Sequence, residues 1–245
     1  MIDMLLENER IDDLHRKGYK IIQNTEGFCF GIDAVLLSGF ARVKKGEKVL
    51  DMCTGTGIIP ILLEAKTDGE HFSAIEIQEQ VADMARRSVA LNDLQDKIDI
   101  VTGDIRKCTD YFKASSFDVI TCNPPYMVPG RGFVCENSPK AYSRHEILCN
   151  INDVFNTANK MLKYGGRMYM VHRCERLTDI FVSARGNNIE PKALRLIEPR
   201  AGKSSELVLI EFSKGGKPGL KVMPSLVIYN SDGSYTDEVY DIYYN

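Results

Sequence analysis

Residues 47–63 join a short apolar strand, a glycine turn and an apolar helix without a break. The strand covers 47–53, Thr54-Gly55-Thr56-Gly57 follows at once, and the next residues are again apolar. Strand, glycine turn and helix in this order form the nucleotide-binding start of a doubly wound parallel sheet. The glycines let a ligand lie against the backbone, and a helix N-terminus favours polar or negative ligand groups. Pro60 replaces the third glycine of a dinucleotide fingerprint, which weakens the case for NAD.

A carboxylate ends the next expected strand at the distance where nucleotide-binding folds hold a ribose. Residues 72–77 are strand-like, and Glu76 lies 19 residues past Gly57. A carboxylate there can accept hydrogen bonds from both ribose hydroxyls. The alternative is a plain surface glutamate, which carries less weight beside the glycine turn.

Asn123-Pro124-Pro125-Tyr126 ends a further apolar strand, because neither proline can donate to a strand ladder. The Asn123 side-chain oxygen and the Pro124 carbonyl then form two acceptors on a stiff turn, with the Tyr126 ring beside them. Two fixed acceptors suit an NH2 group, whose lone pair becomes more available for attack when both hydrogens are held. The turn therefore predicts a site for an amine nucleophile; a rigid loop with a packed aromatic is the alternative.

Strands and helices alternate through the rest of the chain. The expected elements are a helix over 78–92, strands over 98–102 and 117–122, a helix over 151–162, a strand over 167–172, a helix to about 185, and strands over 193–197 and 206–212. This pattern predicts a parallel sheet with an antiparallel finish. Asp104 either contacts a cofactor adenine or caps the short helix that follows it.

Both ends of the chain carry additions to this pattern. Residues 19–23 and 27–30 suggest a hairpin or two extended segments, and Asp33 is expected to cap a helix ending near Phe40. A second hairpin is expected near the C-terminus, around the Asp232-Gly233 turn signal.

The formal net charge of −3 hides an asymmetry. Residues 1–120 carry 15 basic and 21 acidic side chains, whereas residues 191–221 carry 7 and 3, so a polyanion favours the second segment. A loop over 127–145 adds further cations. Candidate phosphate contacts are Arg131, Lys140, Arg144, Arg200 and Lys203, although solvated loop charge is the commoner explanation for any one of them.

The seven cysteines are never closer than 13 residues, so no Cys-x-x-Cys metal or redox pair exists and no metal site is expected. Dispersed thiols predict a reduced, cytoplasmic protein. The first ten residues lack the basic start of a signal peptide, and no apolar run reaches the roughly 20 residues of a membrane span.

These features together resemble the class I S-adenosylmethionine-dependent methyltransferases, and among them the bacterial tRNA1(Val) adenine N6-methyltransferase family. The resemblance covers nearly the whole chain. Its motifs are Lys20-Ile-Ile-Gln23, Phe28-Cys-Phe-Gly-Ile-Asp-Ala-Val-Leu-Leu37, Val49-Leu-Asp-Met-Cys-Thr-Gly-Thr-Gly57, Asn123-Pro-Pro-Tyr126 and Leu226-Val-Ile-Tyr-Asn-Ser-Asp-Gly-Ser-Tyr-Thr236.

The resemblance implies a Rossmann-like α/β fold with helices on both faces of a seven-stranded, mostly parallel sheet, in the order 3-2-1-4-5-7-6 with the last strand antiparallel. Residues 1–45 would be a hairpin and helix extension covering the cofactor site. The methyltransferase domain would span 46–214, and residues 215–245 would be a linker and a hairpin packed on that domain.

The resemblance also assigns roles around S-adenosylmethionine. It places Asp51, Gly55 and Gly57 at the methionine end, Glu76 at the ribose and Asp104 near the adenine, while Asn123 and Pro124 hold the target amine and Tyr126 stacks on a flipped base. The other implied cofactor contacts are Phe30, Gly31, Asp33, Cys53, Thr54, Ile77, Ile105 and Asn123. Cys53 is a departure, since related enzymes more commonly have glycine there.

The implied activity is N6-methylation of an adenine in RNA, expected to be tRNA near the anticodon, by a monomeric enzyme. A protein-glutamine N5-methyltransferase acting on release factors is an alternative, because a side-chain amide also presents NH2. That family usually has a longer helical domain before its glycine turn. Two further possibilities are an amino-methyltransferase acting on ribosomal RNA and a non-catalytic protein that binds S-adenosylmethionine or RNA.

Overall fold

The computed structural model describes residues 5–27, 29–126 and 149–244. Its elements are β1 (Glu9–Asp13), β2 (Lys20–Asn24), α1 (Ile32–Phe40), β3 (Lys48–Met52), α2 (Ile58–Lys66), β4 (His71–Glu76), α3 (Glu79–Leu91), β5 (Ile98–Thr102), the 3-10 helix η2 (Ile105–Asp110), β6 (Phe117–Cys122), α5 (Ile151–Met161), β7 (Leu162–Arg173), the 3-10 helix η4 (Cys174–Arg176), α6 (Leu177–Gly186), β8 (Ile189–Arg200), β9 (Leu207–Lys214), β10 (Lys221–Val222), β11 (Leu226–Tyr229) and α7 (Asp237–Tyr244).

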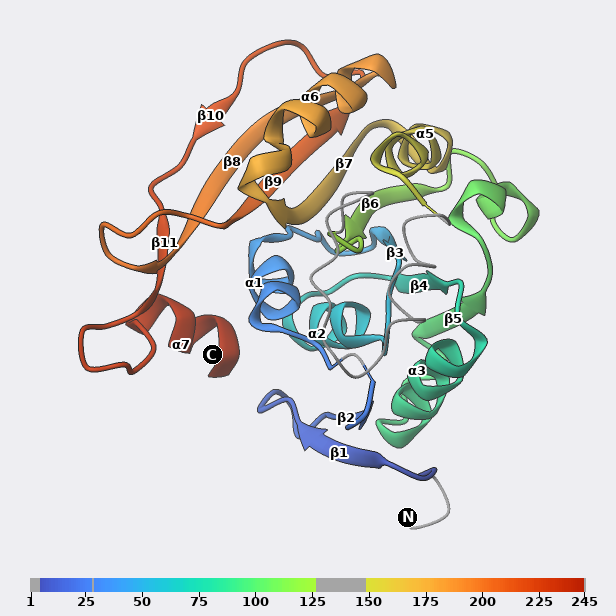
Figure 1. Ribbon diagram of the computed structural model, residues 1–245. Coiled ribbons are helices and arrows are strands. Elements are labelled where there is room, and N and C mark those ends of the chain that lie inside the picture. The colour runs from blue at the N-terminus through green and yellow to red at the C-terminus, as the bar shows by residue number, and fades with distance from the viewer. Residues whose placement is uncertain (1–4, 28, 127–148, 245) are drawn as a thin grey trace.

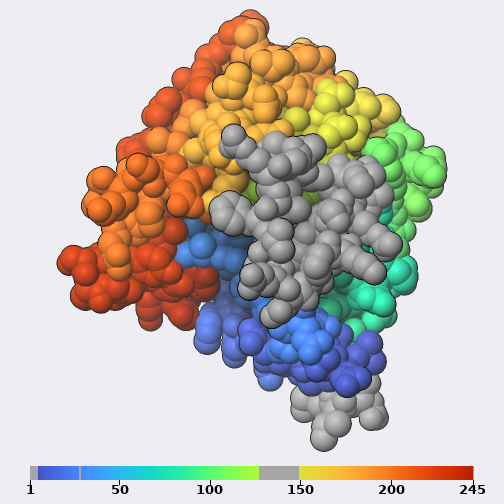
Figure 2. All heavy atoms as spheres, in the orientation of Figure 1, coloured from blue at the N-terminus to red at the C-terminus, as the bar shows by residue number. Residues whose placement is uncertain are grey.

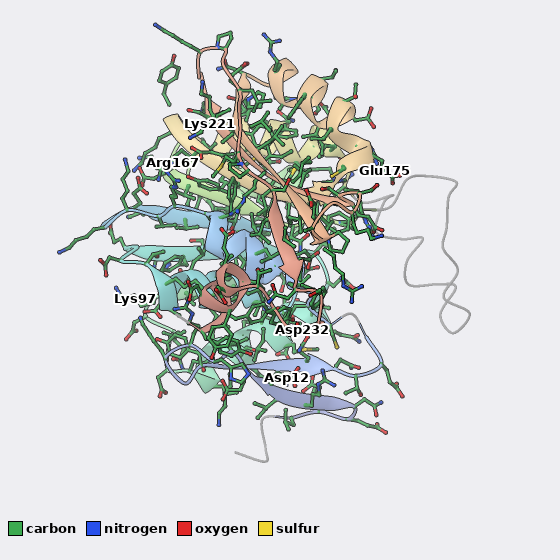
Figure 3. The ribbon with its side chains drawn as sticks, turned by 90° about the vertical axis from the view of Figure 1, so that its left-hand side faces the viewer. Asp12, Lys97, Arg167, Glu175, Lys221 and Asp232 are labelled. Carbon is green, nitrogen blue, oxygen red and sulfur yellow. The ribbon has the colours of Figure 1, made fainter. Side chains whose placement is uncertain are left out.

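One twisted sheet carries the site (Figure 1). The core strands lie in the order β5-β4-β3-β6-β7-β9-β8, and β9 is antiparallel to both of its neighbours, as the resemblance implied. In the described part of the chain the sheet has nine strands rather than seven, because the short strands β10 and β11 pair in parallel with β8. Parallel strands share one carboxyl edge, and ligands of such sheets bind there. In Figure 3, Glu175, after β7, marks this edge, and Lys97, before β5, lies on the opposite side.

Alternation along the central strands builds a core on each face of the sheet. Val49 and Val119 pack on one face with α1 and α2, while Leu50 and Ile120 pack on the other with α5 and α6. These four strand residues are fully buried. Successive residues of one strand therefore stabilise the helix layers on opposite faces of the sheet. None of the helices in the described ranges is long and apolar enough to cross a membrane.

The N-terminal hairpin differs from the expected one. β2 pairs with β1, over 9–13, whereas the expected partner was the segment after β2. The sequence of β1, Glu-Arg-Ile-Asp-Asp, has little apolar alternation, which is why periodicity did not reveal it. The hairpin is held on α3 instead: Arg87 forms a two-bond ion pair with Glu9, and Ser88 Oγ accepts the backbone N–H of Ile22 at 3.0 Å.

The expected C-terminal hairpin is present but short, and a helix that the sequence did not predict follows it. A single antiparallel bridge joins Tyr229 to Tyr235, and the residues that follow form helix α7. The Arg16 guanidinium donates to the carbonyls of Asp241 and Ile242, near the end of that helix. The C-terminal segment, red in Figure 2, accordingly lies close to the blue N-terminal region.

Candidate active site

The glycine turn after β3 depends on left-handed backbone conformations. Cys53, Gly55 and Gly57 have φ of 59°, 58° and 82°. Gly57 is the N-cap of α2, and a Cβ there would lie 3.2 Å from the Ala85 Cβ. A larger residue at position 57 would therefore be strained and crowded. Cys53 occupies a conformation that glycine adopts without steric cost and that is strained for a side chain with a Cβ.

Glu76 braces this turn from the end of β4. Its Oε2 accepts the backbone N–H of Gly55 at 3.0 Å, and its Oε1 accepts that of Gln78 at 3.1 Å. The residue is 6 % exposed. Oε1 also accepts the Gln78 side-chain amide at 3.3 Å, whereas Oε2 keeps a second lone pair, so Glu76 can hold the turn and still accept from a ribose hydroxyl.

Asp51 is buried at the carboxyl end of β3, beside β6. Its Oδ1 accepts the Thr121 hydroxyl at 2.6 Å, as the pairing of these two residues across the strands allows. Within the described residues, Asp51 Oδ2 and the Thr54 hydroxyl are buried without a hydrogen bond. Burial raises the pKa of Asp51 to about 7, although the nearby Thr121 and Thr54 hydroxyls favour the ionised form. Buried polar atoms without partners next to a glycine turn fit a ligand with a cationic or hydrogen-bonding group, such as the ammonium of a methionine moiety.

The Asn123–Tyr126 turn follows β6, the neighbour of β3. Met52 pairs with Cys122, so the glycine turn and the Asn123 turn leave adjacent strands at the same level. The Tyr126 hydroxyl lies 2.5 Å from Asn123 Oδ1 and 2.7 Å from Asp33 Oδ2, and Asn123 Nδ2 donates to Asp33 Oδ2 at 3.3 Å. The adjacency of strands β3 and β6 therefore brings the predicted amine acceptor next to the predicted cofactor turn.

Tyr126 packs on residues that the sequence did not reveal. Its ring meets the edge of His172 with centroids 5.1 Å apart, and the Arg173 guanidinium lies 5.8 Å from the ring centroid. Burial lowers the pKa of His172 to about 4, and its Nδ1 accepts the backbone N–H of Arg173, so the ring is neutral at pH 7. Both residues lie at the carboxyl end of β7. The sequence around them has no motif, so only the position of β7 next to β6 in the sheet could have indicated them.

Asp104 caps the 3-10 helix η2, which was one of its two expected roles. Its carboxylate accepts the backbone N–H of Arg106 at 2.9 Å and pairs with that residue's guanidinium. The Ile105 side chain is buried in the core against α5, so only its backbone can face a ligand. Ile77, Phe30 and Gly31 keep some exposure.

The expected phosphate contacts divide into two groups. Arg200 ends β8, which runs parallel to β7, and Lys203 lies in the turn after it, so both are at the carboxyl edge of the sheet. Both residues are exposed. Arg131, Lys140 and Arg144 lie outside the described residues. In the described part of the chain, no group of three or more His, Cys, Asp or Glu side chains is arranged to hold a metal ion.

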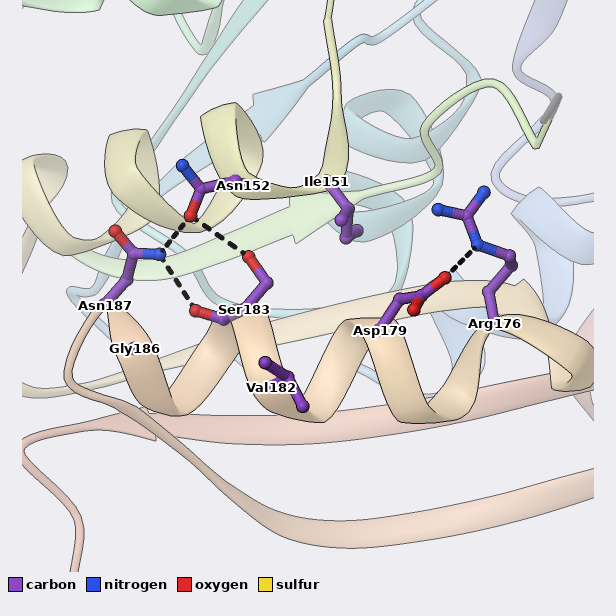
Figure 4. Close-up of a pocket in the computed structure, with 8 residues that line it drawn as sticks. All are labelled: Ile151, Asn152, Arg176, Asp179, Val182, Ser183, Gly186 and Asn187. Atoms are coloured by element: carbon purple, nitrogen blue, oxygen red, sulfur yellow. Dashed lines mark hydrogen bonds and ion pairs between the residues drawn. The ribbon is translucent and has the colours of Figure 1, made fainter. Parts of the chain in front are cut away.

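A groove of about 570 Å³ lies between the start of α5 and helix α6 (Figure 4). Its polar side chains bond one another: Asn187 Nδ2 donates to Asn152 Oδ1 at 2.9 Å, and Arg176 pairs with Asp179. The residues of the glycine turn and the Asn123 turn do not line it. The groove is therefore separate from the candidate active site.

The fold and the site define a class I methyltransferase. The sequence profile of the methyltransferase small domain family matches residues 31–180, more than half of the 245 residues, and the chain belongs to this family. Two curated relatives are named tRNA1(Val) (adenine(37)-N6)-methyltransferase. The one from Aeromonas hydrophila is 24 % identical over 84 % of this chain and 85 % of the relative, and the one from Histophilus somni is 27 % identical over 91 % of each.

Solved structures agree on the fold. A predicted O-methyltransferase from Agrobacterium tumefaciens has a TM-score of 0.70 at 21 % identity, over 86 % of this chain and 94 % of its own. A tRNA m1G37 methyltransferase from M. jannaschii has a TM-score of 0.58 at 15 % identity, over 86 % of this chain and 55 % of its own. The family and the curated relatives together identify an enzyme that transfers methyl groups.

Proposed function

We propose that this enzyme methylates the N6 amine of an adenine in RNA, and that the RNA is a tRNA with its target near the anticodon. The observation that carries the proposal is the side-by-side exit of the glycine turn and the Asn123 turn from strands β3 and β6. A cofactor on the first turn and an amine on the second would lie next to each other, as direct transfer requires. The names of the relatives, tRNA1(Val) (adenine(37)-N6)-methyltransferase, support the same substrate class.

S-adenosylmethionine fits the polar groups at this edge, and when bound it supplies an electrophilic methyl group on a sulfonium. Asp51 and Thr54 would face its methionine end, since both have buried polar atoms without partners in the described chain. Glu76 would hold the ribose while it braces Gly55. The remaining predicted contacts, including Asp104 and Ile105, would lie along the rim formed by β4 and β5.

The Asn123 turn would hold and orient the amine. Asn123 Oδ1 and the Pro124 carbonyl each accept one N–H, which directs the nitrogen lone pair toward the methyl group. Tyr126 would stack on the base once it leaves its stack in the RNA. The chain needs no strong base, because the proton released by the methylated amine can pass to water.

We propose that Arg200 and Lys203 contact the phosphate backbone of the RNA. Both are exposed at the edge that carries the site, and in the described part of the chain neither forms an ion pair. We extend the same role to Arg131, Lys140 and Arg144. We further propose that the enzyme is a cytoplasmic monomer, with residues 1–45 covering the cofactor site, 46–214 forming the methyltransferase domain and 215–245 packed on it.

The deciding experiment offers labelled S-adenosylmethionine and total tRNA from a strain lacking this gene, followed by nucleoside analysis, with Asn123→Ala as the control. We expect N6-methyladenosine with the wild type and none with the variant. Label on a release factor or on ribosomal RNA, with tRNA unlabelled, would refute the substrate and keep the amine chemistry. The release-factor outcome would favour the glutamine N5 alternative.

A further inference from the structure

The carboxylate of Asp33 joins helix α1 to the Asn123 turn across 90 residues of chain. Its Oδ2 accepts both the Asn123 amide and the Tyr126 hydroxyl, and its Oδ1 accepts the backbone N–H of Ala34 at 2.9 Å. Asp33 is buried, with 9 % exposure, one residue inside the start of α1 and not at its cap, Gly31. Both of its oxygens therefore face protein donors.

The contact with Asp33 decides which way the Asn123 amide is turned. An ionised carboxylate only accepts hydrogen bonds, so the atom of Asn123 that faces it must be the NH2 group. The acceptor Oδ1 is then turned toward Tyr126, whose hydroxyl lies 2.5 Å away. An amide turned the other way would present NH2 to the NH2 of a substrate, and two donors cannot form a hydrogen bond.

We propose that Asp33 is the positioning residue of the amine-holding turn: it orients the Asn123 amide and offers the Tyr126 hydroxyl a second acceptor, so that a substrate amine can replace this hydroxyl at Asn123 Oδ1. The inference rests on the proposed function, in which Asn123 holds the amine. It gives Asp33 a role toward the substrate rather than the cofactor contact that the family resemblance implied.

The hydroxyl of Tyr126 can change partner without leaving a group unpaired. It has one hydrogen and two acceptors within reach, Asn123 Oδ1 and Asp33 Oδ2, so it donates to one at a time. When a base amine donates to Asn123 Oδ1, the hydroxyl still has Asp33. Burial, and then the charge of Asp33, raise the pKa of Tyr126 well above its ordinary value, so the phenol stays a donor.

A reciprocal exchange of the two side chains tests this role. The variants are Asp33→Asn, Asn123→Asp and the double variant, each assayed for the kcat of methyl transfer and for the Kd of S-adenosylmethionine. Asn123→Asp places two carboxylates in contact, and we expect kcat to fall by about 100-fold. In the double variant the amide at position 33 donates to the carboxylate at position 123, which still accepts an amine. We therefore expect its kcat to recover at least about tenfold over Asn123→Asp.

Asp33→Asn alone separates positioning from cofactor binding. We expect kcat to fall about tenfold while the cofactor Kd changes less than about twofold, because one acceptor for Asn123 and Tyr126 is weakened. Asp118→Asn is the matched control, since Asp118 pairs with Lys163 near the start of β6, at the opposite edge of the sheet, and should leave kcat unchanged.

Two results would overturn the proposal: a double variant no more active than Asn123→Asp, or an Asp33→Asn variant whose cofactor affinity falls as much as its kcat. Thermal unfolding of each variant identifies a folding failure, and if Asn123→Asp does not fold, the kcat and Kd of Asp33→Asn decide. The wild type is assayed on tRNA in parallel, which tests the proposed function separately. If it methylates another amine substrate, the variants are compared on that substrate.

Discussion

The carboxylate of Glu76 accepts the backbone N–H of Gly55 at 3.0 Å, so the end of β4 holds the glycine turn that leaves β3. The two residues are 21 positions apart. A turn rich in glycine has many accessible conformations, and a fixed acceptor selects the one in which its backbone can face a ligand. Glu76 therefore fixes the conformation of the glycine turn without a ligand.

Replacing Glu76 by Gln tests this support. An amide has one acceptor oxygen in place of two, so Gly55 or Gln78 loses its partner and a ribose hydroxyl loses an acceptor. We expect the Kd of S-adenosylmethionine, measured by calorimetry, to rise about tenfold or more, equivalent to about 1.4 kcal/mol. Glu79→Gln, which removes an exposed carboxylate paired with Arg86, should leave the Kd unchanged. Equal effects of the two substitutions would contradict the prediction.

The positive φ of Cys53 predicts an unusual order of stability between two substitutions. At ordinary φ, alanine is more stable than glycine, but at φ of 59° the alanine Cβ is strained. We expect the free energy of unfolding, measured by urea denaturation, to be about 1 kcal/mol higher for Cys53→Gly than for Cys53→Ala. The same pair at Cys174, which begins η4 and has no positive φ, should show the ordinary order. A higher free energy of unfolding for Cys53→Ala than for Cys53→Gly would contradict the prediction that position 53 is strained.

The raised pKa of Asp51 predicts that its burial costs more stability as the pH rises. Its pKa is about 7 in the folded protein, against an ordinary value of 3.8, so between these values the native state binds more protons than the unfolded state. Stability then falls with rising pH in this window. Relative to Asp51→Asn, we expect the wild type to lose about 2 kcal/mol of unfolding free energy between about pH 5.5 and 8. A difference that stays constant with pH would contradict the assignment.

Ionisation of Asp51 should also strengthen cofactor binding. The methionine end of S-adenosylmethionine carries an ammonium, which an ionised carboxylate attracts and a protonated one does not. We expect the Kd to decrease from about pH 6 to pH 8 in the wild type and to stay flat in Asp51→Asn. Equilibrium binding at several pH values measures the Kd of the wild type and of the variant. If the Kd of Asp51→Asn decreases in the same way, the titrating group is not Asp51.

Arg200 and Lys203 are predicted to contribute to RNA affinity through charge. In a double Arg200→Gln, Lys203→Gln variant we expect the Kd for tRNA to rise about tenfold near physiological salt, and the slope of log Kd against log salt to fall by about 1 to 2. The kcat at saturating tRNA should not change. Lys217→Gln with Lys221→Gln removes the same charge after β9 and beside the first half of β8, away from the carboxyl edge, and should alter neither quantity.

The sequence alone determined where the glycine turn and the Asn123 turn lie. Glycines at 55 and 57 permit the left-handed conformations of a tight turn, and prolines at 124 and 125 cannot continue a strand, so the ends of β3 and β6 could be predicted without knowledge of the fold. Alternating elements also predicted a mostly parallel sheet with an antiparallel finish, and the family resemblance implied the order of its core strands. The hydrophobic pattern could not show β1 or α7, because the first has few apolar residues and the second depends on packing against α1 and β11.

Only the tertiary structure decided which polar groups meet. The pairing of Asp51 with Thr121 follows from the register of β3 against β6, and that of Asp33 with Asn123 from the way α1 packs on the sheet. The members of these pairs are 70 and 90 residues apart. Local conformational preferences place each residue on an element, whereas side-chain contacts over such separations depend on how the elements pack, and packing is a property of the whole chain.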